Sequence, residues 1–217
     1  TTVLHGSECI HEELWVGERH LRFEIHPRSF FQPNSLQAER LYAEAVRAAF
    51  AEAEGAPAAT VPTATERLGR VFDLYCGTGT LALCFADRAE SVLGIELVAE
   101  AVDGARRNAA SNAAENVRFE LGDVPALLAK HCPEPLGPRD VVVVDPPRCG
   151  ILSTGIAQLR RLAPLRIVYV SCNPFSLAAD VAALGAEGYA LRSLQPFDMF
   201  PHTGHVECVA ALARVAS

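Results

Sequence analysis

The sequence predicts an α/β protein with a doubly wound, mostly parallel sheet that ends in an antiparallel hairpin. Five strand-like runs alternate with segments able to form helices, and the runs are almost continuous Val, Ile and Leu, as in strands buried on both faces. The strand-like runs are RVFDLY (70–75), SVLGIE (91–96), NVRFEL (116–121), DVVVVD (140–145) and RIVYVS (166–171); the helical segments are 79–88, 98–112, 124–131, 153–163 and 175–187. Two further runs, YALRSLQPFDMF and HVECVAALARV, are joined by PHTG without a helix, which indicates the closing hairpin.

The N-terminal part is organised differently. EELWVGERHLRFEI (12–25) reads as two short strands around Gly17, a small β-hairpin. A helix is expected from about Ser35 to Glu54, with Asn34 or Ser35 as its N-cap. The Gly, Ala, Pro and Thr of residues 55–65 suggest a flexible linker. We therefore expect a hairpin appendage over residues 1–26 and one main domain over 27–217.

Composition limits the possible classes of protein. Half of the 217 residues are hydrophobic, enough for the core of one domain. Seven scattered cysteines with no CxxC pair favour free thiols in a reducing compartment over a disulfide framework or a zinc site, so we expect no bound metal. No apolar stretch is long enough to span a bilayer, and a cytoplasmic protein is the expectation. A net charge of −7 argues against nucleic-acid binding unless a basic surface is local or lies on a segment outside this chain.

FDLYCGTGTLAL (72–83) reads as strand, glycine turn and helix. Gly77 and Gly79 let the backbone approach a ligand at the carboxyl edge of the sheet, where α/β proteins bind nucleotides. Glu96 ends the next strand, 19 positions after Gly77, and there a carboxylate can accept hydrogen bonds from a ribose. A tight turn and a helix cap are the alternatives. The combination favours a nucleoside-containing cofactor, and both NAD and S-adenosylmethionine fit, because the looser GxGxxA pattern tolerates Ala82.

DPPRCG (145–150) follows the fourth strand. Its prolines make a rigid corner against which a flat ring can lie, while Asp145 points into the cleft. A stiff loop with Asp145 as a helix cap is the alternative. Arg148 is able to pair with Asp145 or with a phosphate, although a solvated arginine is more common.

YVSCNP (169–174) places Cys172 where the fifth strand meets a helix that Pro174 opens. A thiol facing a helix N-terminus is expected to favour its thiolate, which is the nucleophile. The alternative is a buried structural cysteine. Glu207 stands in an apolar run, where partial burial would raise its pKa into the range of a proton acceptor, unless it simply points outward.

Five motifs in order, FFQPN (30–34), DLYCGTGTLAL, DPPRCGI, YVSCNP and DMFPHTGHVE, resemble those of the RNA uracil-C5 methyltransferases, which make 5-methyluridine in tRNA and rRNA. The resemblance runs from about Phe23 to Leu212. It implies a Rossmann-like class I methyltransferase fold, an RNA substrate and S-adenosylmethionine as the methyl donor. Family members commonly carry an N-terminal RNA-binding barrel, and some an iron–sulfur cluster. Neither is expected in this chain, which we predict to be a monomer with weak RNA affinity by itself.

The resemblance also assigns roles to individual residues. It implies Cys172 as the nucleophile and Glu207 as the proton acceptor, with Phe30 near the target base. The residues implied to bind the cofactor are Gln32, Tyr75, Thr80, Glu96, Asp123 and Asp145, in addition to the glycine turn.

Three rival functions stay open at this point. An RNA cytosine-C5 methyltransferase also uses a cysteine, but on a proline–cysteine pair of the fourth strand, where this chain has DPPR. A non-catalytic module that binds cofactor or RNA is the second alternative. An NAD-dependent dehydrogenase is the third.

Overall fold

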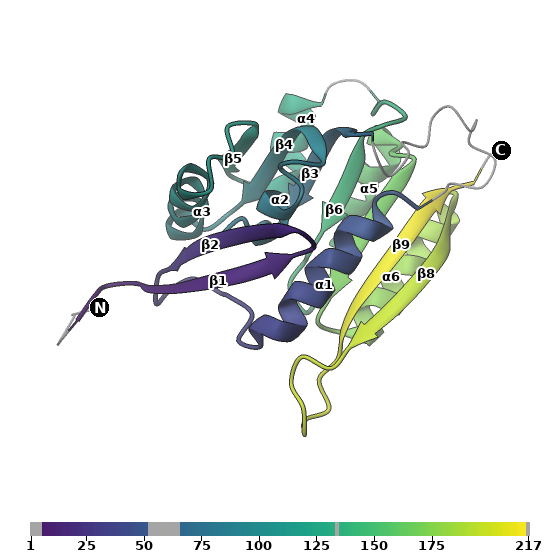
Figure 1. Cartoon of the computed structure of the whole chain (residues 1–217). Coiled ribbons are helices and arrows are strands. Elements are labelled where there is room, and N and C mark those ends of the chain that lie inside the picture. The colour runs from purple at the N-terminus through teal and green to yellow at the C-terminus, as the bar shows by residue number, and fades with distance from the viewer. Residues whose placement is uncertain (1–5, 52–65, 133–134, 216–217) are drawn as a thin grey trace.

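The structure, a computed structural model, describes residues 6–51, 66–132 and 135–215. They are arranged around a central seven-stranded sheet (Figure 1). The strand order is β5-β4-β3-β6-β7-β9-β8. The strands are β3 (Leu68–Leu74), β4 (Ala89–Glu96), β5 (Val117–Leu121), β6 (Val141–Val144), β7 (Arg166–Ser171), β8 (Tyr189–Phe197) and β9 (Glu207–Arg214). The first five pair in parallel, whereas β9 pairs antiparallel with both β7 and β8. The predicted fold class is confirmed, including its closing hairpin.

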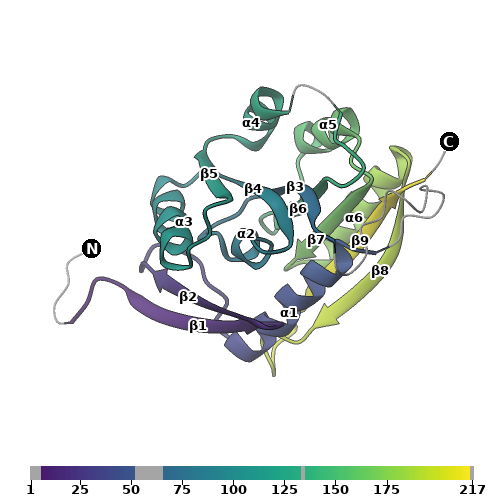
Figure 2. The same cartoon turned by 45° about the horizontal axis from the view of Figure 1, so that its top comes forward.

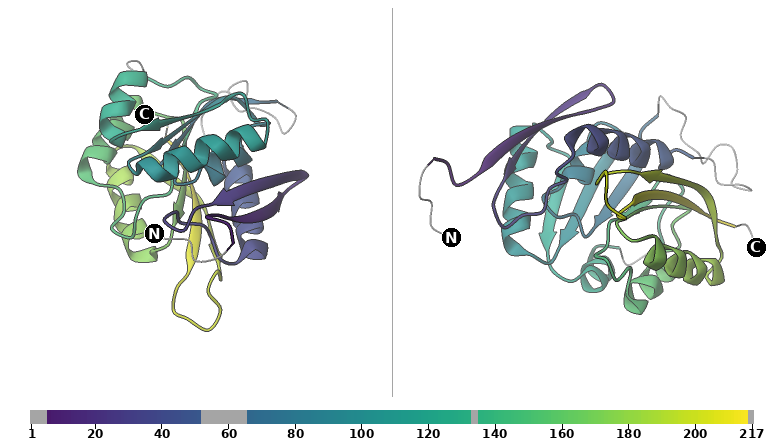
Figure 3. Two further views of the ribbon diagram at one scale, coloured as in Figure 1. Left: turned by 90° about the vertical axis from the view of Figure 1, so that its left-hand side faces the viewer. Right: turned by 90° about the horizontal axis from the view of Figure 1, so that it is seen from below.

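Helices cover both faces of the sheet, as Figures 2 and 3 show. One face packs against α1 (Ser35–Ala48), α2 (Thr80–Cys84) and α3 (Ala99–Ser111), and the other against α4 (Val124–His131), α5 (Ser153–Leu162) and α6 (Pro174–Ala186). Successive strand residues alternate between two hydrophobic cores, so Val141 and Val143 face the α1 side while Val142 and Val144 face the α5 side. None of the helices in the described ranges is long and apolar enough to cross a membrane.

The expected N-terminal hairpin is present as β1 (Ile10–Val16) and β2 (Arg19–Ile25), which form a separate two-stranded sheet. Two side-chain amides, one in α3 and one at its C-cap, hold the free edge of β2. Asn108 accepts from the Glu24 N–H at 2.8 Å and donates to the Glu24 carbonyl, and Asn112 pairs in the same way with Arg22. Asn108 also donates to the Thr78 carbonyl in the glycine turn. The hairpin is therefore tied to the loop that follows β3. The predicted division into domains at residue 26 stays a prediction.

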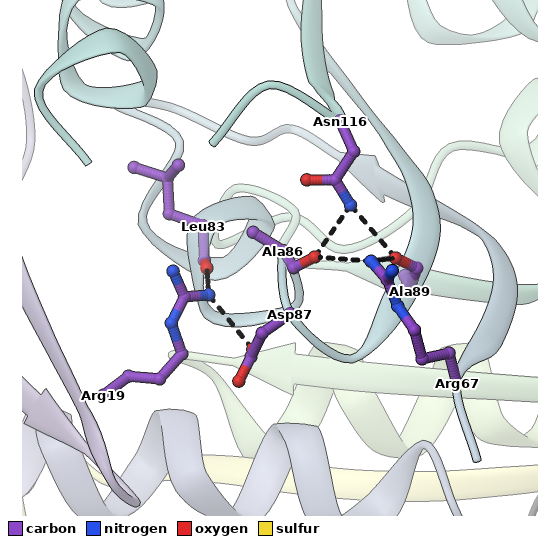
Figure 4. Close-up of polar contacts among 7 residues, drawn as sticks. All are labelled: Arg19, Arg67, Leu83, Ala86, Asp87, Ala89 and Asn116. Carbon is purple, nitrogen blue, oxygen red and sulfur yellow. Dashed lines mark hydrogen bonds and ion pairs between the residues drawn. The ribbon is translucent and has the colours of Figure 1, made fainter. Parts of the chain in front are cut away.

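Two expected helices are shorter than predicted. The α1 helix ends at Ala48, followed by a turn, and the predicted linker 55–65 lies outside the described residues. The α2 helix spans Thr80–Cys84 instead of 79–88, because side chains take up carbonyls in its last turn and after it (Figure 4). Arg19 donates to the Leu83 carbonyl at 2.7 Å, and Asn116 donates to the Ala86 carbonyl at 2.7 Å. Arg67 donates to the carbonyls of Ala86 and Ala89. These long-range partners satisfy the C-terminal carbonyls and let β4 begin early.

Candidate active site

A cavity of about 620 Å³ opens at the carboxyl ends of β3 and β6. These two strands are neighbours in the sheet, while the chain passes from β3 to β4 on one side and from β6 to β7 on the other. Ligands of open α/β sheets bind where the strand order reverses in this way. The glycine turn after β3 and the Asp-Pro-Pro-Arg segment after β6 form facing parts of the wall.

The cavity wall contains eleven of the twelve residues that sequence analysis singled out. They are Phe30, Gln32, Tyr75, Gly77, Thr80, Glu96, Asp123, Asp145, Arg148, Cys172 and Glu207. They come from both ends of the chain and from five of the predicted strand ends, so the structure brings together segments separated by up to the whole length of the domain.

Gly79 is the exception, because it is not part of the wall. It is the N-cap of α2 with φ +80°, and a Cβ atom at this position would lie 2.5 Å from the Phe119 ring. Gly77, with φ +53°, has open space where a Cβ would be. The two glycines therefore have different roles. Gly79 lets the start of α2 pack against Phe119, and Gly77 leaves room in the cavity.

Strand periodicity places four reactive groups on the same face of the sheet. Asp73 shares its face with Val71, and Asp145 continues the register of Val141 and Val143. The other two groups, Cys172 and Glu207, lie on this same face, because they continue the alternation of the paired strands β7 and β9. Period-two alternation thus directs side chains from four strands into the space under α1.

Cys172 and Glu207 are neighbours across two strands. The antiparallel register pairs Ser171 with Cys208, so Cys172 and Glu207 are the next positions along the two chains. Glu207 is 4% exposed, which excludes the alternative of an outward-pointing strand residue. Burial raises the pKa of the Glu207 carboxyl, as expected, and the guanidinium of Arg148 opposes that rise.

The expected thiolate at Cys172 is wrong for the protein without ligand. Burial raises the pKa of the Cys172 thiol, and the charges of Glu207 and Asp145 raise it further. Arg148 and the backbone N–H of Cys172 itself lower the pKa, but less. The helix N-terminus is visible in the sequence, whereas the carboxylates that arrive from the ends of β6 and β9 come close to the thiol only in the folded protein.

The cavity is acidic. Of the described residues in its wall, five carry carboxyl groups and one, Arg148, is basic. Burial raises the pKa of Asp145 well above its ordinary value, with Glu207 and Asp73 contributing to the rise. Among the residues that the structure describes, no group of three His, Cys, Asp or Glu side chains is arranged to hold a metal ion.

Sequence analysis missed Asp73. It is fully buried on β3, its Oδ2 accepts from the Ala82 N–H at 2.8 Å, and its Oδ1 has no partner. Burial raises the pKa of Asp73 to about 7, and the charge of Glu96 adds to the rise. The signal was available, because Asp73 is a carboxylate in an apolar run, as is Glu207. Tyr42 of α1 also lines the cavity, but nothing in the sequence distinguishes it from a core residue.

Glu96 is held by three backbone groups. Its Oε2 accepts from the Gly77 N–H at 3.0 Å, and its Oε1 accepts from the N–H groups of Leu97 and Val98 at the start of α3. The carboxylate is thus both a helix cap and part of the cavity wall. Asp123 combines the same two roles, because it caps α4 through the Ala126 N–H.

Comparison with known proteins supports the family resemblance of the five sequence motifs. A family profile described as tRNA (Uracil-5-)-methyltransferase matches residues 139–215, and a general methyltransferase domain profile matches residues 66–157. An RNA methyltransferase of Chlamydia muridarum is 38% identical over all of this chain and 50% of its own length, and one of Caldanaerobacter subterraneus is 43% identical over 98% of this chain and 42% of its own. The chain thus carries a match to the tRNA (uracil-5-)-methyltransferase family over residues 139–215 and is a relative of RNA methyltransferases along nearly its whole length.

The solved structures extend the family comparison. The tRNA (uracil-54, C5)-methyltransferase of Pyrococcus abyssi, crystallised with S-adenosyl-L-homocysteine, is 34% identical with a TM-score of 0.74, and the match covers 96% of this chain and 45% of that one. A ribosomal protein L11 methylase of Lactobacillus delbrueckii, 17% identical with a TM-score of 0.58 over 88% of this chain and 84% of its own, shares the fold alone. The chain spans about half the length of the family members it matches, or less.

Proposed function

We propose that this domain binds S-adenosylmethionine in the acidic cavity and transfers its methyl group to C5 of a uridine in RNA. The observation that carries the proposal is the meeting of Cys172 and Glu207 in one cavity wall with the glycine turn. No other described part of the chain combines a nucleophile, a raised-pKa carboxyl and a nucleotide-binding turn in this way.

Two orphaned acceptors support the cofactor. The Oδ1 atom of Asp73 and the Oε1 atom of Gln32 are buried without a hydrogen-bond partner, and both residues line the cavity. Buried polar atoms in proteins rarely stay unpaired. The α-ammonium group of S-adenosylmethionine is a donor of the required kind, and we propose that these two residues hold the amino-acid end of the cofactor. Glu96 and Asp123 are the candidates for its nucleoside.

The charge of the cavity favours the same ligand over NAD. The carboxylates of the wall would repel the pyrophosphate of a dinucleotide, whereas a ligand with a sulfonium and an ammonium group is attracted and favours their ionised form. When bound, S-adenosylmethionine supplies an electrophilic methyl group. The acidic wall therefore supports a methyl-transfer reaction and argues against the dehydrogenase.

The residues present account for each step on the uracil ring. C5 of uracil is a weak nucleophile, so the Cys172 thiolate adds to C6 and delivers an electron pair to C5. With the cofactor bound, C5 would then take its methyl group, and the electron pair of the broken S–C bond would stay on the cofactor's sulfur. Glu207 removes the proton that C5 still carries, and the electron pair of that C–H bond expels the thiolate from C6. Removal of the proton restores the ring and leaves 5-methyluridine. The base must leave its stack to reach Cys172, and we propose that it stacks on Phe30, which lines the cavity and is 69% exposed.

The test is methyl transfer from labelled S-adenosylmethionine to unmodified tRNA and rRNA, followed by mass spectrometry of the nucleosides. We expect 5-methyluridine with the wild-type protein and none with Cys172→Ala, which should still bind the cofactor. Label in 5-methylcytidine would support the cytosine enzyme instead. A non-catalytic module would be supported if the protein bound S-adenosylmethionine but transferred no methyl group to any RNA. The same result would be required of a full-length family member that carries this domain.

A further inference from the structure

The segment between β6 and α5 is held by two hydrogen bonds to residues outside it. Its residues Pro146, Pro147 and Arg148 form part of the cavity wall. Asn173, directly after Cys172, donates from Nδ2 to the Arg148 carbonyl at 2.9 Å. Farther along the segment, the Ile151 N–H donates to an oxygen of Asp180 at 2.7 Å. Both holding groups belong to the stretch of chain that follows the nucleophile.

Asp180 is a buried carboxylate, 8% exposed, on α6. The same Oδ2 atom that accepts from Ile151 also accepts from the Tyr169 hydroxyl at 2.6 Å. Gly150 lies against it with φ +82°, and a Cβ at that glycine would be 2.4 Å from Oδ2. The α6 helix and the segment can therefore pack this closely only because position 150 is a glycine and Asp180 supplies an acceptor for the Ile151 N–H.

This contact links the position of Arg148 to that of Cys172. The α6 helix begins at Pro174, two residues after Cys172, so a group fixed to α6 is fixed relative to the thiol. Arg148 is the only basic residue among the described ones that line the cavity, and its charge acts on both Cys172 and Glu207. Arg148 is itself exposed, so release of the segment would let the guanidinium move away from both groups.

We propose that Asp180 is a positioning residue that, together with Asn173, locks the Pro-Pro-Arg segment to the helix after Cys172 and so keeps Arg148 beside the nucleophile and the proton acceptor. The inference rests on the proposed function for its purpose. Its geometry is tested without turnover, because the reactivity of the Cys172 thiol reports the charge of Arg148 directly.

The experiment measures alkylation of Cys172 by iodoacetamide against pH, resolved by peptide mass spectrometry so that the exposed Cys149 is counted separately. In Asp180→Ala, thiolate formation at Cys172 should decrease about two- to threefold at neutral pH, as expected for removing one exposed charge nearby. Asp180→Asn is the matched control, since an amide oxygen can still accept from both Ile151 and Tyr169. We expect its alkylation profile to follow that of the wild type.

A second variant keeps the test decisive if Asp180→Ala does not fold. Asn173→Ser retains an N-cap for α6 but is too short to reach the Arg148 carbonyl, and we expect its profile to shift in the same direction as that of Asp180→Ala. Unchanged profiles in the variants that fold, or a shift in Asp180→Asn as large as that in Asp180→Ala, would overturn the proposal.

Turnover separates this inference from the proposed function. If the wild type makes 5-methyluridine, Asp180→Ala should lower kcat while leaving the Kd for S-adenosylmethionine within about twofold, since Asp180 accepts from Ile151 and Tyr169, neither of which we assign to the cofactor. If the wild type makes no product, the proposed function fails, and the alkylation profiles still decide the role of Asp180.

Discussion

The carboxylate of Glu96 accepts a hydrogen bond from the backbone N–H of Gly77, 19 positions earlier, at 3.0 Å. The bond closes the glycine turn of β3 onto the end of β4, and two more N–H groups at the start of α3 hold the same carboxylate. Strand, turn and helix thus present one rigid acceptor to the cavity. This relationship links the local motif to the shape of the proposed cofactor site.

We expect Glu96→Gln to weaken S-adenosylmethionine binding about tenfold or more. The amide can still accept from Gly77 or from the helix, but it cannot serve all three donors and a ribose, and the loss of one charge-assisted hydrogen bond costs about 1.5–3 kcal/mol. Isothermal titration calorimetry measures the change. Glu100→Gln, on the exposed first turn of α3, is the control and should bind normally. Equal affinities for both variants would contradict the role of Glu96.

Glu207→Gln should stop the reaction after methyl transfer. Without a proton acceptor, C5 keeps its proton, so the RNA stays bonded to Cys172, and turnover should decrease about 10²- to 10⁴-fold. A protein–RNA species that survives denaturing electrophoresis is the expected readout. Adding Cys172→Ala to the same variant must abolish it. Normal turnover in Glu207→Gln would assign the proton to another group.

The stability of the protein without ligand should decrease as the pH rises from about 4 to 7. The folded-state pKa of Asp73 is about 7 against an ordinary 3.8, so in this range the folded protein keeps a proton that the unfolded chain releases. Full ionisation costs on the order of 4 kcal/mol. Urea unfolding at pH 5 and pH 8 measures the effect. Asp73→Asn should flatten the profile, although Asp145 and Glu207, whose pKa values are also raised, keep part of the slope. If the free energy of unfolding of Asp73→Asn depended on pH as strongly as that of the wild type, the predicted contribution of Asp73 would be contradicted.

The two glycines of the turn should respond differently to alanine. Gly79→Ala places a Cβ atom 2.5 Å from Phe119 at a positive φ, so we expect a loss of about 2–4 kcal/mol in the free energy of unfolding. Gly77→Ala meets no atom within 4 Å and should lose only about 1–2 kcal/mol from its φ. Its methyl group enters the cavity wall, so it should weaken cofactor binding more than Gly79→Ala does in the folded fraction. Thermal unfolding and calorimetry together separate the two effects.

A cationic ligand should lower the pKa of the Cys172 thiol. The charges of Glu207 and Asp145 raise that pKa in the protein alone, and a sulfonium group in the cavity offsets them. Alkylation of Cys172 against pH should therefore have a lower midpoint with S-adenosylmethionine than with S-adenosylhomocysteine, which has the same shape without the sulfonium charge. Identical midpoints would show that the thiol does not sense the ligand.

Local sequence determined the order and kind of the elements. The Val-rich runs, the caps at Asn34, Asp123 and Asn173, and the turn at Gly17 each act over a few residues, so their patterns can be read without a structure. The edge of the sheet that carries the site followed from the same patterns, because parallel strands end together. The order of the five motifs added the family resemblance, and with it the proposed cofactor and the proposed roles of Cys172 and Glu207.

Tertiary structure alone decided the electrostatics of the site and the long-range hydrogen bonds that support it. The pKa of Cys172 depends on carboxylates from β6 and β9, whose distance from the thiol no local pattern encodes. The early end of α2 depends on Arg19, 64 positions from the carbonyl to which it donates, and the contact of Asp180 with Ile151 crosses 29 positions. Propensity and periodicity act through neighbouring residues, whereas Coulomb energies and desolvation depend on distances in space. These distances exist only once the chain has folded.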